Sequence, residues 1–294
     1  MVWKANSAIG SVGVVIVLLL SCFHGAAIAQ TPEAPKAEET GDLQLQLAMT
    51  LVGKGLFLRG FYLNNDLAYD TAGLVVGTPE VGDWTVAAVN VLKAERRGAK
   101  EIELDGVRVA IQYNPDANEF QRHPLNNEKV KILVADSGDL QGFETAIRAI
   151  FAMGIDPAFQ RSMQDFWRHY FDPNLAWPQD SLNGQTIYAL AGGPNQARDV
   201  TPPKVEHRTD AKLPTFAQRD KVQGTVLLRI VVDAEGVPHR ISVARPLGYG
   251  LDESAVEAMA KWHFQPGMKD GRPVAAGIVV QQEFSPLPPT HSMR

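Results

Sequence analysis

The segment Leu213–Phe284 constrains the fold most, because its local signals follow one another in one consistent order. Gly224 opens a predicted strand with apolar residues at every second position, and the turn residues Asp233–Gly236 follow it. A second predicted strand, Val237–Ala244, returns and places Ile241 and Val243 on the buried face. The order of signals therefore predicts a hairpin at the start of this segment.

A helix and a last strand complete the segment. Asp252 is a predicted N-cap, Leu251 before it can pack on Val256, and Pro266 is expected to end the helix. Asp270-Gly271 then predicts a hairpin turn that leads into a strand over Val274–Phe284. Strand, hairpin, helix and strand in this order indicate an α+β unit.

The first 29 residues have the pattern of a secretory signal peptide. Lys4 is the positive region, Val12–Leu20 is apolar, and Ala27-Ile28-Ala29 is a small-residue cleavage site. The alternative is an uncleaved membrane anchor, because a span needs roughly 20 apolar residues. A further alternative is acylation of Cys22, the single cysteine of the chain. Cleavage predicts a periplasmic protein.

Composition shifts divide the rest of the chain. We predict a tether, an N-terminal domain, a Gly/Pro-rich linker, a C-terminal domain and a tail, since segments rich in Pro and Gly separate the apolar patterns. The predicted ranges are 30–41, 42–190, 191–204, 205–285 and 286–294.

The N-terminal domain is predicted to be mainly antiparallel β with two late helices. Leu43–Leu51 alternates with period two, as in a strand. Further strands are predicted over Trp84–Lys93, Glu101–Tyr113 and Lys129–Ala135, the first two as an antiparallel pair.

The two helices have clear start and stop signals. Phe143–Met153 carries apolar residues on one face and stops at Gly154. Asp156 caps a second helix that begins at Pro157 and carries an apolar stripe as far as Tyr170.

Composition and motifs argue against several classes of function. The net charge of −5 and the lack of a long basic run make nucleic acid an unlikely partner. Neither a Gly-x-Ser-x-Gly elbow, a His-Glu-x-x-His motif nor paired cysteines occur, so we predict no enzyme, no cofactor and no metal. Asp165 and His169 stand one helical turn apart, but a third metal ligand is missing nearby.

Three other candidates also favour ordinary structural roles. Trp262, Phe264 and Pro266 are predicted to pack the helix end onto the sheet, because aromatic side chains bury large areas. His263 beside them is predicted to be packing or surface. Gly248–Gly250 lacks the lysine and the longer glycine framework of a phosphate loop.

The C-terminal segment resembles the C-terminal domain of the TonB energy-transducer family. The resemblance rests on Leu213-Pro214-x-x-Ala217, Gly224-Thr225-Val226, Asp233-x-x-Gly236, Leu251-Asp252-x-x-Ala255 and Trp262-x-Phe264-x-Pro266, in this order over about 75 residues. It implies an antiparallel three-stranded sheet with two helices on one face. The whole chain is thus predicted to be α+β, with this domain following a separate β-rich N-terminal domain.

The resemblance also implies a mechanism and a partner. Members of the family dock onto outer-membrane receptors by adding a short extended segment of the receptor to the edge of their last strand. The resemblance implies an outer-membrane TonB-dependent receptor, or another envelope protein, as the partner in transmembrane transport. The candidate edge residues, listed together, are Ile278, Val279, Val280, Gln281 and Gln282.

The resemblance does not extend to the membrane helix of the energised members. Their Ser-x-x-x-His motif is missing, since Leu20 stands four residues before His24. Coupling to a proton-driven complex therefore stays open. The alternative function is a structural periplasmic protein that forms homodimers through the same edge strand, without energy transduction.

Overall fold

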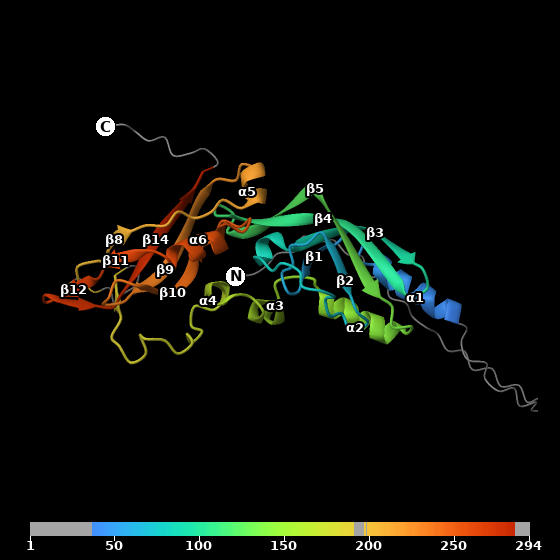
Figure 1. The fold of residues 1–294 in the computed structure, drawn as a ribbon, viewed down its shortest axis with the longest axis horizontal. Helices are drawn as coiled ribbons and strands as arrows, with labels where there is room; N and C mark the ends of the chain where they lie inside the picture. The colour runs from blue at the N-terminus through green and yellow to red at the C-terminus, as the bar shows by residue number, and fades with distance from the viewer. Residues whose placement is uncertain (1–36, 191–196, 198, 286–294) are drawn as a thin grey trace, which may run out of the picture.

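The computed structural model describes residues 37–190, 197 and 199–285, which form two lobes side by side (Figure 1). The predicted signal peptide with Cys22, the tail and most of the linker lie outside these residues. Within the described part of the chain, no helix has both the length and the apolar character required to cross a bilayer. Both lobes mix helices and sheets, so the predicted α+β class is confirmed.

The N-terminal lobe is built on a six-stranded sheet with the order β2-β5-β4-β3-β1-β6. Its strands are β1 (Gly55–Leu58), β2 (Asp66–Tyr69), β3 (Ala88–Arg97), β4 (Glu101–Asn114), β5 (Glu119–Ala135) and β6 (Phe151–Ala152). The predicted antiparallel pair is confirmed as β3 and β4, although Trp84–Val86 forms a 3-10 turn before β3. Strand β5 begins ten residues before the predicted Lys129, and β2 joins it in parallel.

The strand predicted over Leu43–Leu51 is wrong, because the chain forms helix α1 (Ala37–Met49) there. The helix also takes up the end of the predicted tether. Gln44, Ala48 and Leu51 are buried, whereas Leu43 is 45% exposed. The buried positions thus recur with helical spacing, and the alternating leucines do not mark a buried face.

The late helices differ from prediction in their bounds and number. Helix α2 (Leu140–Ile150) stops before β6, whereas the prediction extended it to Met153. The cap at Asp156 is confirmed, since its side chain accepts a hydrogen bond from the Phe159 amide. The predicted second helix is divided into α3 (Pro157–Arg161) and α4 (Asp165–Phe171).

The C-terminal lobe is built on a sheet with the order β10-β9-β14-β7. Its strands are β7 (Tyr188–Ala189), β9 (Gly224–Val232), β10 (Pro238–Arg245) and β14 (Ala276–Phe284). Strands β10, β9 and β14 are antiparallel, as predicted. A bulge after His239 leaves Ile241 half-buried, so the prediction that it lies on the buried face is only partly right.

Helices α5 (Thr215–Arg219) and α6 (Leu251–Met259) belong to this lobe. Asp252 is not the N-cap, because that position is taken by Gly250. The Asp252 carboxylate instead accepts hydrogen bonds from the amides of Leu247 and Gly248, at 2.8 and 2.7 Å. It therefore fixes the loop that leads into the helix.

The helix ends well before Pro266, because His263–Gln265 forms strand β11. Strand β11 pairs with β8 (Lys204–His207), which begins at the last residue of the predicted linker. The predicted turn at Asp270-Gly271 is confirmed and joins β12 (Gly267–Lys269) to β13 (Arg272–Val274). Both turn residues have positive φ, as a tight hairpin turn requires.

The lobes join along a buried contact that we call the seam. In the seam, the loop Leu247–Gly250 of the C-terminal lobe contacts strand β4 and the 3-10 turn before β3 in the N-terminal lobe. The Tyr249 amide donates to the Ile111 carbonyl and the Tyr113 amide donates to the Leu247 carbonyl, both at 3.0 Å. Gly248 has φ 92°, and a Cβ there would lie 2.0 Å from the Ile111 carbonyl oxygen. Only glycine allows this approach.

A second connection is the segment 172–190, here called the strap, which runs from α4 to the far edge of the C-terminal sheet (Figure 1). The Arg240 guanidinium binds Asp180 through two hydrogen bonds, of 2.7 and 2.8 Å. The strap ends in β7, which pairs in parallel with Ala276 and Gly277 of β14.

Candidate functional site

Strand β14, which contains the five predicted partner-binding residues, has two unequal neighbours. Strand β9 pairs with it over its whole length, from Ala276 to Phe284. Strand β7 covers only Ala276 and Gly277. Among the described residues, no strand pairs with the outer edge of β14 beyond that point. The outer edge is therefore partly covered by the chain itself, and from Ile278 onward no strand of the described ranges pairs with it.

The hydrogen bonds to the strap show which peptide groups face outward. The amides of Tyr188 and Leu190 donate to the carbonyls of Ala275 and Gly277, at 3.0 and 2.9 Å. Because successive residues of a strand turn their N–H and C=O groups to opposite edges, the next outward-facing residues are Val279, Gln281 and Glu283.

The structure divides the five predicted residues into two sets. Val279 and Gln281 turn their main-chain groups to the open edge, whereas Ile278, Val280 and Gln282 turn theirs to β9. Glu283 also faces outward and was missed in the sequence analysis. Its position two residues after Gln281 could have identified it, once the pairing side was known.

Side chains follow the same alternation. Ile278 and Val280 pack against the core that α5 and α6 help to form, and Gln282 is 4% exposed. Val279 points to the opposite face and is 41% exposed. The last strand thus has one side in the core and one side in contact with solvent.

A groove of about 280 Å³ lies on this second face, next to the start of the open edge. The sheet contributes Arg229, Val231, Gly277 and Val279 to its lining, among others. Helix α4 and the strap contribute His169, Pro173, Trp177 and Ala189. The groove is therefore built by both lobes.

Asp165 and His169 do not form a paired site. Asp165 binds Arg168 at 2.8 Å. The ring of His169 stacks on Trp177 with 3.5 Å between centroids, and burial lowers the pKa of His169 below its ordinary value. The histidine therefore acts as a neutral aromatic surface in the groove wall.

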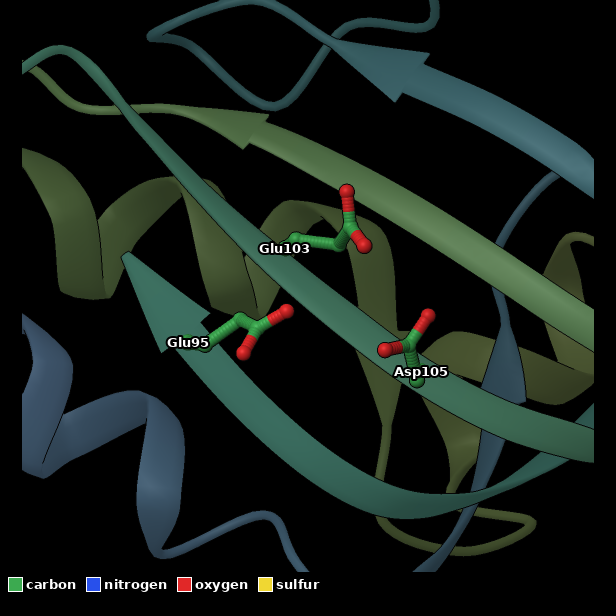
Figure 2. Close-up of side chains that lie close together, drawn as sticks. All are labelled: Glu95, Glu103 and Asp105. Atoms are coloured by element: carbon green, nitrogen blue, oxygen red, sulfur yellow. The ribbon is translucent and has the colours of Figure 1, made fainter. Parts of the chain in front are cut away.

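Three carboxylates lie close together on the N-terminal sheet. Glu95 on β3, and Glu103 and Asp105 on β4, have oxygens within 4.8 Å of one another (Figure 2). Lys93 binds Glu95, while Arg97 and Lys131 bind Glu103. These cations balance much of the negative charge, so the cluster is explained as an ion-pair network on the sheet.

Other carboxylates are buried or half-buried where the lobes meet. Asp83 accepts hydrogen bonds from the Thr85 amide and the Trp167 indole, both at 2.7 Å. Burial raises the pKa of Asp83, and it raises that of Asp252 to about 8 and that of Glu253 to about 7. The negative charge of Asp83 adds to the last two shifts. These three carboxyl groups therefore make the stability of the folded protein depend on pH.

The aromatic residues near the end of α6 pack as predicted. Trp262 and Phe264 are 5% and 1% exposed, and the Trp262 indole donates to the Thr209 carbonyl at 2.8 Å. His263 lies at the surface, 3.6 Å from Glu206. These residues hold β8 and β11 against the lobe.

Comparison with known proteins confirms the resemblance in the C-terminal segment. Residues 210–286 match the family described as Gram-negative bacterial TonB protein C-terminal. Protein TonB of Vibrio cholerae is 33% identical over 84 residues, which are 28% of this chain and 34% of that protein. Protein tonB2 of Pseudomonas aeruginosa is 34% identical over 79 residues, 26% of this chain and 29% of that protein.

The chain thus spans about a third of the length of these curated relatives. Among solved structures, the solution NMR structure of the Pseudomonas aeruginosa TonB CTD matches at 23% identity and a TM-score of 0.25. That match covers 33% of this chain and 93% of the other.

Proposed function

We propose that this chain is an exported cell-envelope protein whose C-terminal sheet binds an extended segment of another envelope protein by strand addition. The observation that carries the proposal is that, among the described residues, no strand pairs with the outer edge of β14 beyond Gly277. The match of residues 210–286 to the TonB C-terminal family supports it.

The physical basis is the row of outward-facing peptide groups at Val279, Gln281 and Glu283. A strand edge of this kind is a template for one more strand, because an incoming backbone satisfies the same donors and acceptors that a sheet neighbour would. Main-chain hydrogen bonds depend little on side-chain identity, so one edge serves several partner sequences.

The proposed partner is the periplasmic segment of an outer-membrane receptor. The signal-peptide pattern of residues 1–29 supports export to the periplasm. The proposal concerns docking in TonB-linked transport and leaves coupling to a proton-driven complex open, because the Ser-x-x-x-His motif of energised family members is missing from the first 29 residues.

Photocross-linking in the source organism tests the proposal. A photoreactive amino acid replaces Gln281 in the full-length chain, and mass spectrometry identifies the adduct. We expect an outer-membrane protein joined through an extended segment. Adding Val279→Pro should reduce the adduct at least tenfold, because proline removes an outward-facing donor and leaves the β9 ladder intact.

Val279→Ala is the matched control, because it shortens the same side chain and keeps the N–H donor. We expect it to retain most of the adduct. An adduct that Val279→Pro does not reduce would contradict strand addition. An adduct formed only with a second copy of the chain would instead support self-association through the same edge.

A further inference from the structure

We infer that the groove between the lobes binds a carboxylate side chain of the added strand, so that the N-terminal lobe takes part in choosing the partner. This inference rests on the proposed strand addition and assigns a chemistry to the partner segment. Its ligand class is an extended peptide with a glutamate or aspartate near the end of β7.

The position of Arg229 is the first argument. Arg229 on β9 lies directly opposite Val279 on β14, and both residues line the groove. Because their side chains share one face of the sheet, a strand added outside Val279 would place alternate side chains on that face as well. A long acidic side chain at this level can reach back across Val279 toward the guanidinium.

The charge balance of the groove is the second argument. Its lining contains two arginines, Arg229 and Arg240, and no aspartate or glutamate. Asp180 binds Arg240 through both carboxylate oxygens. For Arg229, by contrast, no carboxylate within the described part of the chain lies at ion-pair distance. The groove therefore offers one guanidinium to an anionic group from outside.

The N-terminal wall is the third argument. His169 and Trp177 present stacked rings to the groove, and His169 is held in place by α4. An apolar wall next to a cation lowers the local dielectric, which strengthens an ion pair formed there. The methylene groups of a glutamate can pack on the Trp177 ring at the same time.

The size of the groove separates a peptide side chain from a free small molecule. Its volume of about 280 Å³ lies below the ~300–1,000 Å³ typical of small-molecule sites. The groove is also continuous with the open edge, since Ile278 and Val279 are part of its lining. Both facts favour a side chain delivered by an extended backbone.

Paired synthetic peptides test the inference on the full-length chain. Each nonapeptide alternates threonine and valine, except at one position. That position is glutamate in one member of a pair and glutamine in the other, and it differs from pair to pair along the series. Fluorescence anisotropy should show the best glutamate peptide binding about fivefold more tightly than its glutamine twin, as a partly exposed ion pair implies. This preference should shrink at high salt.

Arg229→Gln should make the two peptides bind equally, while Trp177→Ala should weaken the glutamate peptide more than the glutamine one. Arg272→Gln, an equal change of charge on the exposed strand β13, is the matched control and should keep the preference. Circular dichroism checks that each variant is folded.

The outcomes separate the two proposals. Equal binding of both peptides, with loss of both in Val279→Pro, would overturn the carboxylate site and leave strand addition in place. A preference removed equally by Arg272→Gln would also overturn it, since net charge would then be the cause. Binding of neither peptide at millimolar concentration would contradict strand addition and this inference with it.

Discussion

The seam and the strap both connect the N-terminal lobe to the C-terminal sheet, but they do so by different physical means. At the seam, main-chain hydrogen bonds link β4 to Leu247–Tyr249 among buried side chains. At the strap, the contacts include the Arg240–Asp180 pair, a bond from Arg240 to Asn183, the stacking of Trp177 on His169 and a two-residue strand. The side chains of Arg240 and Asp180 remain 16% and 23% exposed.

Burial makes the difference between the two connections. A buried main-chain group that loses its partner costs about 1–3 kcal/mol, because water cannot replace the bond. A partly exposed ion pair typically contributes about 1 kcal/mol or less. We therefore expect the seam to hold the lobes together and the strap to detach at much lower cost.

Gly248→Ala should have the largest effect and break the seam. The new methyl group would meet the Ile111 carbonyl oxygen at 2.0 Å, at a residue whose φ is 92°. We expect a loss of at least ~3 kcal/mol in the free energy of unfolding, measured by urea denaturation, because strain and lost hydrogen bonds add.

Gly77→Ala is the matched control for this prediction. Gly77 has φ 88°, and nothing lies within 4 Å of the position of a Cβ. The free energy of unfolding of the Gly77→Ala variant should therefore fall by only ~1–2 kcal/mol, the cost of placing alanine in a left-handed backbone conformation. Equal losses in the two variants would show that the close approach at the seam contributes nothing.

Glu253→Gln should change how the stability of the seam depends on pH. The folded-state pKa of Glu253 is about 7, above its ordinary 4.5, first because of burial and then because of Asp83. The folded protein therefore binds more protons than the unfolded chain over this window, and stability falls as pH rises from about 4.5 to 7.

Thermal unfolding between pH 4.5 and 8 measures this effect. The variant should reduce the decrease of the unfolding free energy with pH by well under ~1.4 kcal/mol per pH unit. The effect stays below this value because Glu253 is partly exposed to solvent. Glu235→Gln, at the exposed β9–β10 turn, should leave the slope unchanged. A wild-type stability that rises across this range would contradict the assignment.

Asp180→Asn should have the smallest effect on global stability and act on the strap alone. The asparagine oxygen keeps the bond from the Leu182 amide, whereas the ion pair with Arg240 is lost. We expect less than ~1 kcal/mol in unfolding free energy. Hydrogen exchange of the Tyr188 and Leu190 amides should nevertheless become several-fold faster.

Asp165→Asn removes another ion pair near the same helix, that of Asp165 with Arg168, and serves as the control. It should leave exchange at Tyr188 unchanged. If Asp180→Asn also leaves that exchange unchanged, the Arg240–Asp180 pair does not hold the strap, and the contrast between the two connections would lose its basis.

The sequence predicted the C-terminal sheet well because its signals are local. The strand over Gly224–Val232 and the turn at Asp270-Gly271 each depend on residues next to one another. The prediction of a strand over Leu43–Leu51 was wrong because leucines at every second position also occur in this helix, where they are not fully buried. Here tertiary packing of Gln44 and Ala48 decided the structure.

The candidate site could be predicted only in part. The resemblance identified β14. Which of its alternate residues turn their N–H and C=O groups outward is set by the pairing with β7, which precedes β14 by about 90 residues. The role of Asp252 was missed for a similar reason: N-capping is the common use of an aspartate before a helix, whereas here it holds the preceding loop. Neither the seam nor the groove leaves a local pattern in the sequence.

The short strand β7 has one more consequence, for the solubility of the protein. Because it occupies the start of the β14 edge, any further strand must stop at about Val279. A neighbouring molecule therefore cannot pair with the full length of this strand edge. Two residues of the chain's own backbone thus shorten the part of this edge at which copies of the protein could pair.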